Sequence, residues 1–226
     1  MTAATVTLQG RHALVAGVGG ALARPTAVAL TESGATVSLL TYADDRTQEV
    51  EAQSIANECW SLGRDGAVVR LDSTDPEAVV AAIARVEALH GPLSVLVTVP
   101  QPLTAVSAAD ASAEDWRSAL DAASGAAVPL LTAGKQMVAR GEGRLVSVLI
   151  DDASESAFAA ASRAAVLAFT RALGAEWGSR GVLVALLLVE AAETQSGPHV
   201  HAGFRAALRD LVTGAPASIA QIEVQR

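Results

Sequence analysis

Three charged side chains are placed where they could take part in acid–base chemistry. Asp151 and Asp152 directly follow the apolar stretch RLVSVLI, and Arg163 lies in the helical stretch SAFAAASRAAVLAFTRALGAEW. Two close carboxylates can push their pKa values apart, which gives an enzyme one acid and one base. Adjacent residues after a strand point in different directions, however. We therefore expect two solvated carboxylates, with Arg163 in a structural ion pair with one of them.

Two histidines and one cysteine offer further chemistry. His199 and His201 are separated by one residue, as metal ligands on a strand often are, and Glu193 is the one acidic residue close by. Because this set lacks a third ligand of clear spacing, we expect no metal site. The single cysteine, Cys59, has no partner for an internal disulfide and is predicted to be a buried thiol.

The balance of charge excludes one class of function. The chain has 16 Lys and Arg against 24 Asp and Glu, a formal charge of −8 with a pI near 5.0, so it lacks the basic surface that binds nucleic acid. The longest apolar run, 182–189, is far shorter than the roughly 18 residues of a membrane-spanning helix. No signal-peptide pattern opens the sequence, and we expect a cytoplasmic protein without a membrane partner.

Short apolar stretches alternate with longer helical stretches along the chain. Nearly all-apolar strands that alternate with helices indicate a parallel sheet covered on both faces, which is a doubly wound Rossmann-type α/β fold. We expect one such domain over residues 1–226. The expected strands are 12–17, 35–41, 66–72, 93–99, 144–150, 182–189 and one near 220–225; the expected helices are 21–34, 46–63, 75–91, about 113–140, 156–177 and a short one near 202–211.

Several stretches of the chain resemble the short-chain dehydrogenase/reductase family. They are LQGRHALVAGVGGALA, VVRLDSTDPEAV, DWRSALDAASG, GRLVSVLI and AASRAAVLAFTRALGAEWGSRGVLV, in the family's order and spacing. The resemblance implies an NAD(P)-dependent reductase or alcohol dehydrogenase. Such enzymes use an Asn-Ser-Tyr-Lys set, in which the Lys and the cofactor ribose lower the pKa of the Tyr.

The catalytic set of the family is missing from this sequence. Its Asn, Ser, Tyr and Lys positions correspond to Ala123, Ile150, Ala159 and Arg163. The chain has one tyrosine, Tyr42, just after the second expected strand, where this fold places the adenosine end of a cofactor. Positioned acid–base groups contribute roughly 10²–10⁴-fold each to a rate. We therefore expect no hydride transfer by the family's mechanism.

The resemblance also implies an altered dinucleotide loop. The family's three loop glycines correspond to Gly17, Ala21 and Ala23, and we expect the two methyl groups to crowd the pyrophosphate. Gly19, Gly20 and Asp72 are vestiges of the site, and Asp72 could equally cap its own turn. The motif after the fourth strand, Asn-Asn-Ala-Gly in the family, reads Thr98, Val99, Pro100 and Gln101, and the Pro-Gly after the sixth strand reads Val189 and Glu190. We therefore expect NAD(P) binding to be lost.

Alanines dominate the two helices expected around 115–140 and 156–178. Small side chains let helices approach closely, and in the family these two helices form a four-helix bundle between subunits. The three tryptophans, Trp60, Trp116 and Trp177, are expected to pack.

The leading hypothesis is a catalytically inactive subunit beside an active paralogue, in a hetero-dimer or hetero-tetramer that acts on 3-hydroxyacyl or 3-oxoacyl thioesters. Two alternatives stay open: an enzyme with non-redox chemistry that uses Arg163 with Asp151 or Asp152, and a regulator that senses NAD(P).

Overall fold

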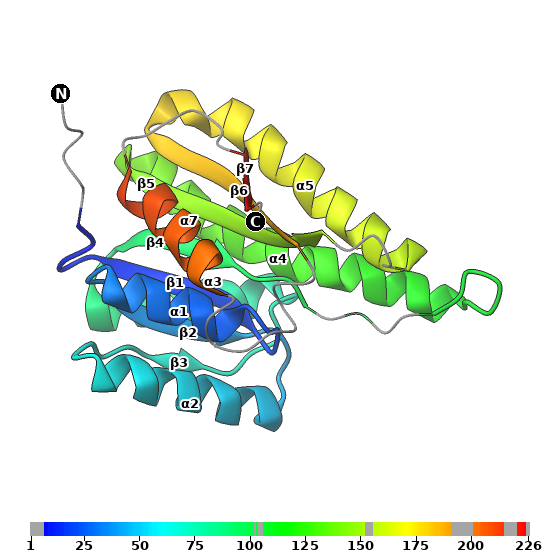
Figure 1. Ribbon diagram of the computed structural model, residues 1–226, viewed down its shortest axis with the longest axis horizontal. Helices are drawn as coiled ribbons and strands as arrows, with labels where there is room; N and C mark the ends of the chain where they lie inside the picture. Colours follow the sequence, from blue (N-terminus) through cyan, green and yellow to red (C-terminus); the bar gives the residue numbers. More distant parts are fainter. Residues whose placement is uncertain are drawn as a thin grey trace.

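A parallel sheet of seven strands runs through the protein (Figure 1). The computed structural model describes residues 7–101, 103, 106–151, 156–190, 201–214 and 221–224. Every hydrogen-bonded strand pair is parallel, in the order β3-β2-β1-β4-β5-β6-β7, which confirms the predicted fold class. The strands are β1 (His12–Val18), β2 (Thr36–Thr41), β3 (Val68–Val69), β4 (Leu93–Thr98), β5 (Gly143–Asp151), β6 (Val182–Glu190) and β7 (Gln221–Val224).

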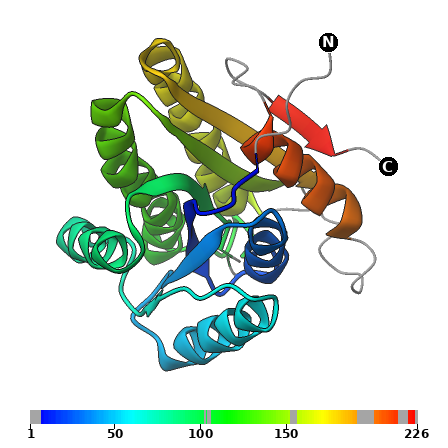
Figure 2. The same cartoon turned by 90° about the vertical axis from the view of Figure 1, so that its left-hand side faces the viewer.

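Helices cover both faces of this sheet (Figure 2). The helices α1, α2 and α7 lie on one side, and α3, α4 and α5 lie on the other. Their bounds are α1 (Ala23–Glu32), α2 (Arg46–Ser61), α3 (Pro76–His90), α4 (Ala113–Arg140), α5 (Ala157–Trp177) and α7 (His201–Thr213), with a short 3₁₀ helix, η1 (Gly178–Arg180), after α5.

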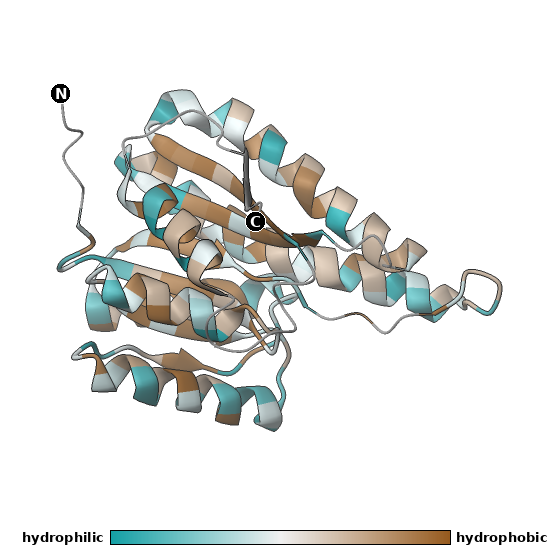
Figure 3. Cartoon of the chain, viewed as in Figure 1, coloured by the Kyte–Doolittle hydropathy of each residue, from teal (hydrophilic) through white to brown (hydrophobic). Residues whose placement is uncertain are grey.

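The strands are apolar because both of their faces are covered. All residues of β1 are buried, and neighbouring residues face opposite layers: Leu14 packs with the α3–α4 side and Val15 with the α1–α7 side. Figure 3 shows the hydrophobic colour running along the strands, whereas the helices carry polar residues on their outer faces. No helix in the described part of the chain is long and apolar enough to cross a membrane.

The order of the strands reverses between β1 and β4. In open α/β sheets the loops on the two sides of such a reversal separate at the carboxyl ends of the strands, and ligands bind in the crevice that results. The long helices α4 and α5 lie side by side and extend past this edge of the sheet (Figure 1). The fold therefore directs attention to the carboxyl ends of β1, β4 and β5.

Local capping sets where these two helices begin. The Ser112 hydroxyl accepts from the backbone N–H groups of Glu114 and Asp115, and the Asp115 carboxylate accepts from the Ser112 N–H, which forms a capping box at the start of α4. At α5, the Ser156 hydroxyl accepts from the Ala159 N–H at 3.3 Å. The second cap fixes the first turn of α5, and with it the position of Ala159.

Two expectations need correction. The third strand is two residues long rather than seven, because β3 pairs with β2 only at Val68 and Val69. Of the three tryptophans, Trp177 is buried, but Trp60 is 70% exposed and Trp116 is 47% exposed. The burial of Cys59 is confirmed, and burial raises the pKa of its thiol.

We predict that Gly134→Ala destabilises the protein although alanine is the better helix former. A Cβ at Gly134 would lie 2.9 Å from Cη2 of Trp177 and 3.0 Å from Cδ1 of Leu145. Overpacking of this kind costs about 1–3 kcal/mol, against a gain of about 1 kcal/mol in helix propensity. Thermal or urea unfolding measures the difference. Gly178→Ala is the control, because nothing lies within 4 Å of its Cβ position, and it should leave stability unchanged or raised. Equal stability of the two variants would contradict the prediction.

Candidate functional site

A cavity of about 330 Å³ lies at the carboxyl ends of β1, β4 and β5. The ends of these strands and the loop after β4 form one wall, and residues of α4 and α5 form the other. Its volume is at the lower end of the range found for small-molecule sites. Most of the lining is apolar and includes Val148 and Leu149 of β5 and Val166 of α5.

Three of the four predicted catalytic positions meet in this cavity. Ile150 comes from the end of β5, and Ala159 and Arg163 come from successive turns of α5. The fourth position, Ala123 of α4, is not part of the lining. It is buried in a small hydrophobic cluster with Leu149, so only its neighbours on α4 reach the cavity.

Arg163 is the one charged side chain among the described lining residues. Its Nη1 lies 3.4 Å from Oδ1 of Asp151, which confirms the predicted ion pair. The Asp151 side chain is 60% exposed, so solvent screens this pair and it contributes little to stability. Asp152 lies outside the described residues. A guanidinium stays protonated at all ordinary pH and therefore supplies charge and hydrogen bonds rather than a transferable proton.

Tyr42 also lines the cavity and lies just after β2. Its ring packs against Gly125 of α4, where a Cβ would collide with the ring and with the Ser73 hydroxyl. Burial, followed by the nearby charges of Asp121 and Asp72, raises the pKa of Tyr42 to about 12. The phenol is therefore protonated near neutral pH and is a poor general base there.

The glycine loop after β1 touches two glutamine side chains. A Cβ at Gly17 would lie 2.9 Å from Nε2 of Gln101, and a Cβ at Gly19 would lie 2.9 Å from Cδ of Gln48 and 3.1 Å from Oε1 of Gln101. Nε2 of Gln101 also donates a hydrogen bond to the Gly17 carbonyl. A dinucleotide pyrophosphate needs an open glycine surface at this point. With both glutamines in place, the residues present do not fit that group.

The predicted role of Ala23 needs correction, whereas that of Ala21 stays a prediction. Ala23 is fully buried in the hydrophobic core at the start of α1, so its methyl group faces the core rather than a ligand. Ala21 is exposed. Sequence reasoning instead missed Gln48 as a site residue. It recorded Gln101 only as a departure from the family motif, and nothing in either position's spacing indicates that the side chain reaches the loop.

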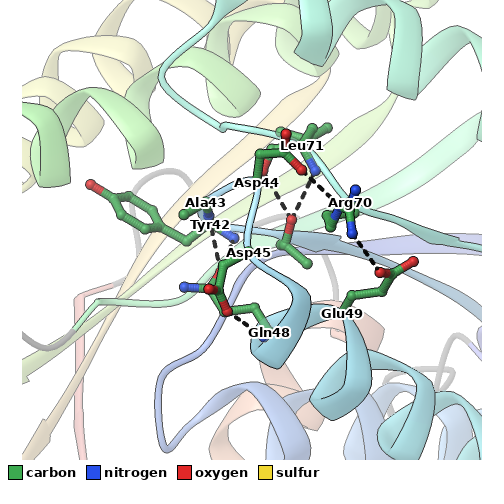
Figure 4. A network of polar contacts seen from close by, with 9 residues as sticks. Tyr42, Ala43, Asp44, Asp45, Gln48, Glu49, Arg70 and Leu71 are labelled. Carbon is green, nitrogen blue, oxygen red and sulfur yellow. Dashed lines mark hydrogen bonds and ion pairs between the residues drawn. The ribbon is translucent and has the colours of Figure 1, made fainter.

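A polar network joins the turn between β2 and α2 to Gln48, which lies in the first turn of α2 (Figure 4). Oε1 of Gln48 accepts from the backbone N–H groups of Tyr42 and Ala43, both at 2.9 Å. Arg70 pairs with Asp44 at 2.7 Å and with Glu49 at 2.9 Å, which joins the turn and the first part of α2 to the segment after β3. Figure 4 shows the Gln48 side chain folded back against this turn, with the Tyr42 ring pointing the other way, toward α4.

The remaining candidates do not add chemistry to the site. Asp72 is exposed, and its Oδ1 accepts from the N–H and the hydroxyl of Thr74 at 2.9 and 2.7 Å, which is the turn-capping role. His199 and Glu193 lie outside the described residues, as does the side chain of His201. Among the residues that are described, no group of His, Cys, Asp and Glu side chains could hold a metal ion.

Comparisons with known proteins agree with the fold and the motifs. The family model described as short chain dehydrogenase matches residues 11–202. Galactitol 2-dehydrogenase (L-tagatose-forming) of Cereibacter sphaeroides is 32% identical over 185 residues, 78% of this chain and 69% of that protein. D-threitol dehydrogenase of Mycolicibacterium smegmatis is 30% identical over 189 residues, 78% of this chain and 68% of that protein.

A solved structure shows what a related fold can hold. A short chain dehydrogenase from Burkholderia cenocepacia, in complex with NADP, is 26% identical with a TM-score of 0.74, over 96% of this chain and 98% of that one. That structure shows that the fold can hold NADP. Whether a dinucleotide fits this chain depends on the residues of its own glycine loop.

We predict that Tyr42 titrates near pH 12. The chain has one tyrosine, so the rise in phenolate absorbance reports this side chain alone. Asp121→Asn should lower the pKa toward its ordinary value because it removes a neighbouring negative charge. The pKa of Tyr42 is raised from 10.0 to about 12 in the folded protein. Its contribution to the free energy of unfolding is therefore fully present below pH 10 and is lost as the pH rises through 12. An unperturbed titration in the folded protein would contradict the prediction.

Proposed function

The chain belongs to the short-chain dehydrogenase family, and we propose that it acts there as a catalytically inactive subunit that stabilises an active relative. One observation supports this above the others: the methyl group of Ala159 lines the cavity where the family's mechanism needs a phenol. The named relatives are dehydrogenases, so the proposal separates the function of this chain from theirs.

Hydride transfer to a carbonyl also requires a proton, and the three family positions that line the described part of the cavity offer no side chain that could donate it. Ile150 and Ala159 are apolar, and Arg163 does not release its proton. The Tyr42 phenol also lines the cavity, but its raised pKa keeps it protonated and it follows β2 rather than standing at a position that the family uses. A second candidate, non-redox chemistry by Arg163 with Asp151, has their ion pair in its favour. It still lacks a described lining group that exchanges protons near neutral pH.

Exposed alanines on α5 support the role of a subunit. They include Ala164, Ala165, Ala168, Ala172 and Ala175, while Arg171 and Glu176 are the long side chains exposed near the end of the helix. Small side chains on the face around Ala164 and Ala168 let a second helix approach closely, and the buried area then stabilises the contact. We propose that this face lies against a partner subunit.

The contribution of α4 to this surface differs from the expectation. Ala119 and Ala123 are buried within the chain, so they are not available to a partner. Two larger side chains, Trp116 and Leu120, are each 47% exposed instead. The Trp116 ring lies 6.2 Å from that of Phe158 in an edge-to-face arrangement, which joins α4 to α5. Exposed aromatic side chains of this kind are enriched at interfaces between proteins.

The proposed partner is an active paralogue of the same fold, in a hetero-dimer or hetero-tetramer. A homodimer would bury the same helices, so the surface alone does not choose between the two. The choice rests on function: an assembly of inactive chains performs no reaction, whereas a mixed assembly stabilises an active neighbour. By the family resemblance, the substrates of such a neighbour would be 3-hydroxyacyl or 3-oxoacyl thioesters. Co-purification of the untagged native protein identifies the partner.

We predict no NAD(P)-dependent turnover by the purified chain on alcohols or ketones, galactitol and D-threitol included. The missing acid–base group alone is worth roughly 10²–10⁴-fold in rate. Absorbance of the reduced nicotinamide measures turnover, with galactitol 2-dehydrogenase as the positive control. A rate that survives purification and disappears in an Arg163→Ala variant of this chain would overturn the proposed inactivity.

We predict that Ala168→Arg dissociates the assembly. The substitution places a long charged side chain in the middle of the exposed α5 face, where a helix–helix contact would have to desolvate it. Light scattering of the native complex measures its mass before and after the change. Ala84→Arg on α3 is the matched control, since Ala84 is equally exposed on a helix outside the proposed contact. If Ala168→Arg leaves the mass unchanged, or the native protein is a monomer, the subunit proposal fails.

A further inference from the structure

The surface on which a dinucleotide would lie is already covered by side chains of this chain. Gly17 and Gly19 have positive φ angles of 97° and 131°, so the loop has the tight glycine conformation of a phosphate-binding turn. Instead of open space, however, the amide of Gln101 lies against both glycines and the amide of Gln48 lies against Gly19.

The Gln101 side chain is bonded to the loop rather than merely near it. Its Nε2 donates to the Gly17 carbonyl, so the loop after β4 is joined to the loop after β1 directly across the reversal in strand order. Any group that approaches Gly17 from the cavity must displace this amide. The Pro100 carbonyl adds to the obstruction, because it would collide with a Cβ at Gly20.

Backbone hydrogen bonds hold the Gln48 side chain in place. Its Oε1 accepts from two backbone N–H groups, those of Tyr42 and Ala43, and the same turn is tied down by Arg70 through Asp44 and Glu49. If Gln48 swung away from Gly19, the Ala43 N–H would lose this acceptor and the Tyr42 N–H would keep only its 3.2 Å bond to the Val18 carbonyl. The loss of a hydrogen bond by a part-buried donor is costly. The amide therefore does not yield freely to a ligand.

We propose that Gln101 and Gln48 form an internal plug that occupies the pyrophosphate surface, so that the chain keeps its cleft closed without a dinucleotide. The inference rests on the proposed inactivity. It adds a second reason for that inactivity, the exclusion of the cofactor, which does not depend on the missing phenol at Ala159. It also says which residues exclude NAD(P): the side chains of Gln48 and Gln101 block the site, whereas the glycine backbone beneath them keeps the conformation of a phosphate-binding turn. Tyr42, packed on Gly125, closes the end of the cleft next to this plug.

Removal of the plug is expected to open the cleft to NAD(P)H. We compare the wild type with Gln101→Ala and with the double variant Gln48→Ala/Gln101→Ala, using the fluorescence of NADH and NADPH and the melting temperature with each nucleotide. The wild type should show no saturable binding up to about 1 mM, and the double variant should bind at least about tenfold more tightly. Gln53→Ala is the matched control, an exposed glutamine on the same helix that is remote from the loop, and it should behave as the wild type.

The outcomes separate the plug from the proposed function. Saturable binding by the wild type below about 1 mM would overturn the plug, and so would failure of both folded variants to bind. If the double variant does not fold, as judged by circular dichroism, Gln101→Ala decides alone, because it leaves both Gln48 hydrogen bonds in place. Turnover is measured separately: a variant that binds NAD(P)H yet remains inactive supports both conclusions, since Ala159 is unchanged. Turnover by the wild type would instead refute the proposed inactivity.

Discussion

The close approach of the loops after β1 and β4 determines the geometry of the rest of this molecule. These strands are neighbours in a parallel sheet, so both loops leave at the same edge and must pass one another at the reversal in strand order. The N–H of Val99 donates to the Ala16 carbonyl at 3.0 Å, and the Val99 carbonyl would lie 2.8 Å from a Cβ at Gly17. Glycine at position 17 makes this approach sterically feasible, and the cavity begins directly beside it.

The cavity combines a preserved framework with altered chemistry. The ends of β4 and β5 and the first turns of α5 bring residues to the places that a family enzyme would use, because the hydrophobic packing that positions these elements is complete. They present aliphatic side chains such as Ile150 and Ala159, the hydroxyls of Thr98, Ser156 and Ser162, and one guanidinium paired to Asp151. Core packing and site chemistry depend on different side chains, so the fold does not require the reactive groups that the family uses.

The same two helices serve the cavity and the outer surface. On α5, Ala159 and Arg163 face the cavity, while Ala164 and Ala168, one to five residues further on, are exposed. An α-helix has 3.6 residues per turn, so consecutive residues point in directions about 100° apart. The cavity-facing and the exposed residues of α5 can therefore be substituted independently, although one helix carries both.

The sequence alone determined the fold class and almost every element, because alternating apolar periodicity directly reflects burial on two faces of a parallel sheet. It also determined which family positions hold Ala123, Ile150, Ala159 and Arg163, since residue identity requires no coordinates. Tertiary structure decided how side chains far apart in the chain meet. The contact of Gln101 with Gly17 spans 84 positions. Ala23 faces the core rather than the loop, and α4 buries Ala119 and Ala123 while it exposes Trp116. Such contacts depend on the relative placement of packed elements, and local periodicity carries no information about that placement.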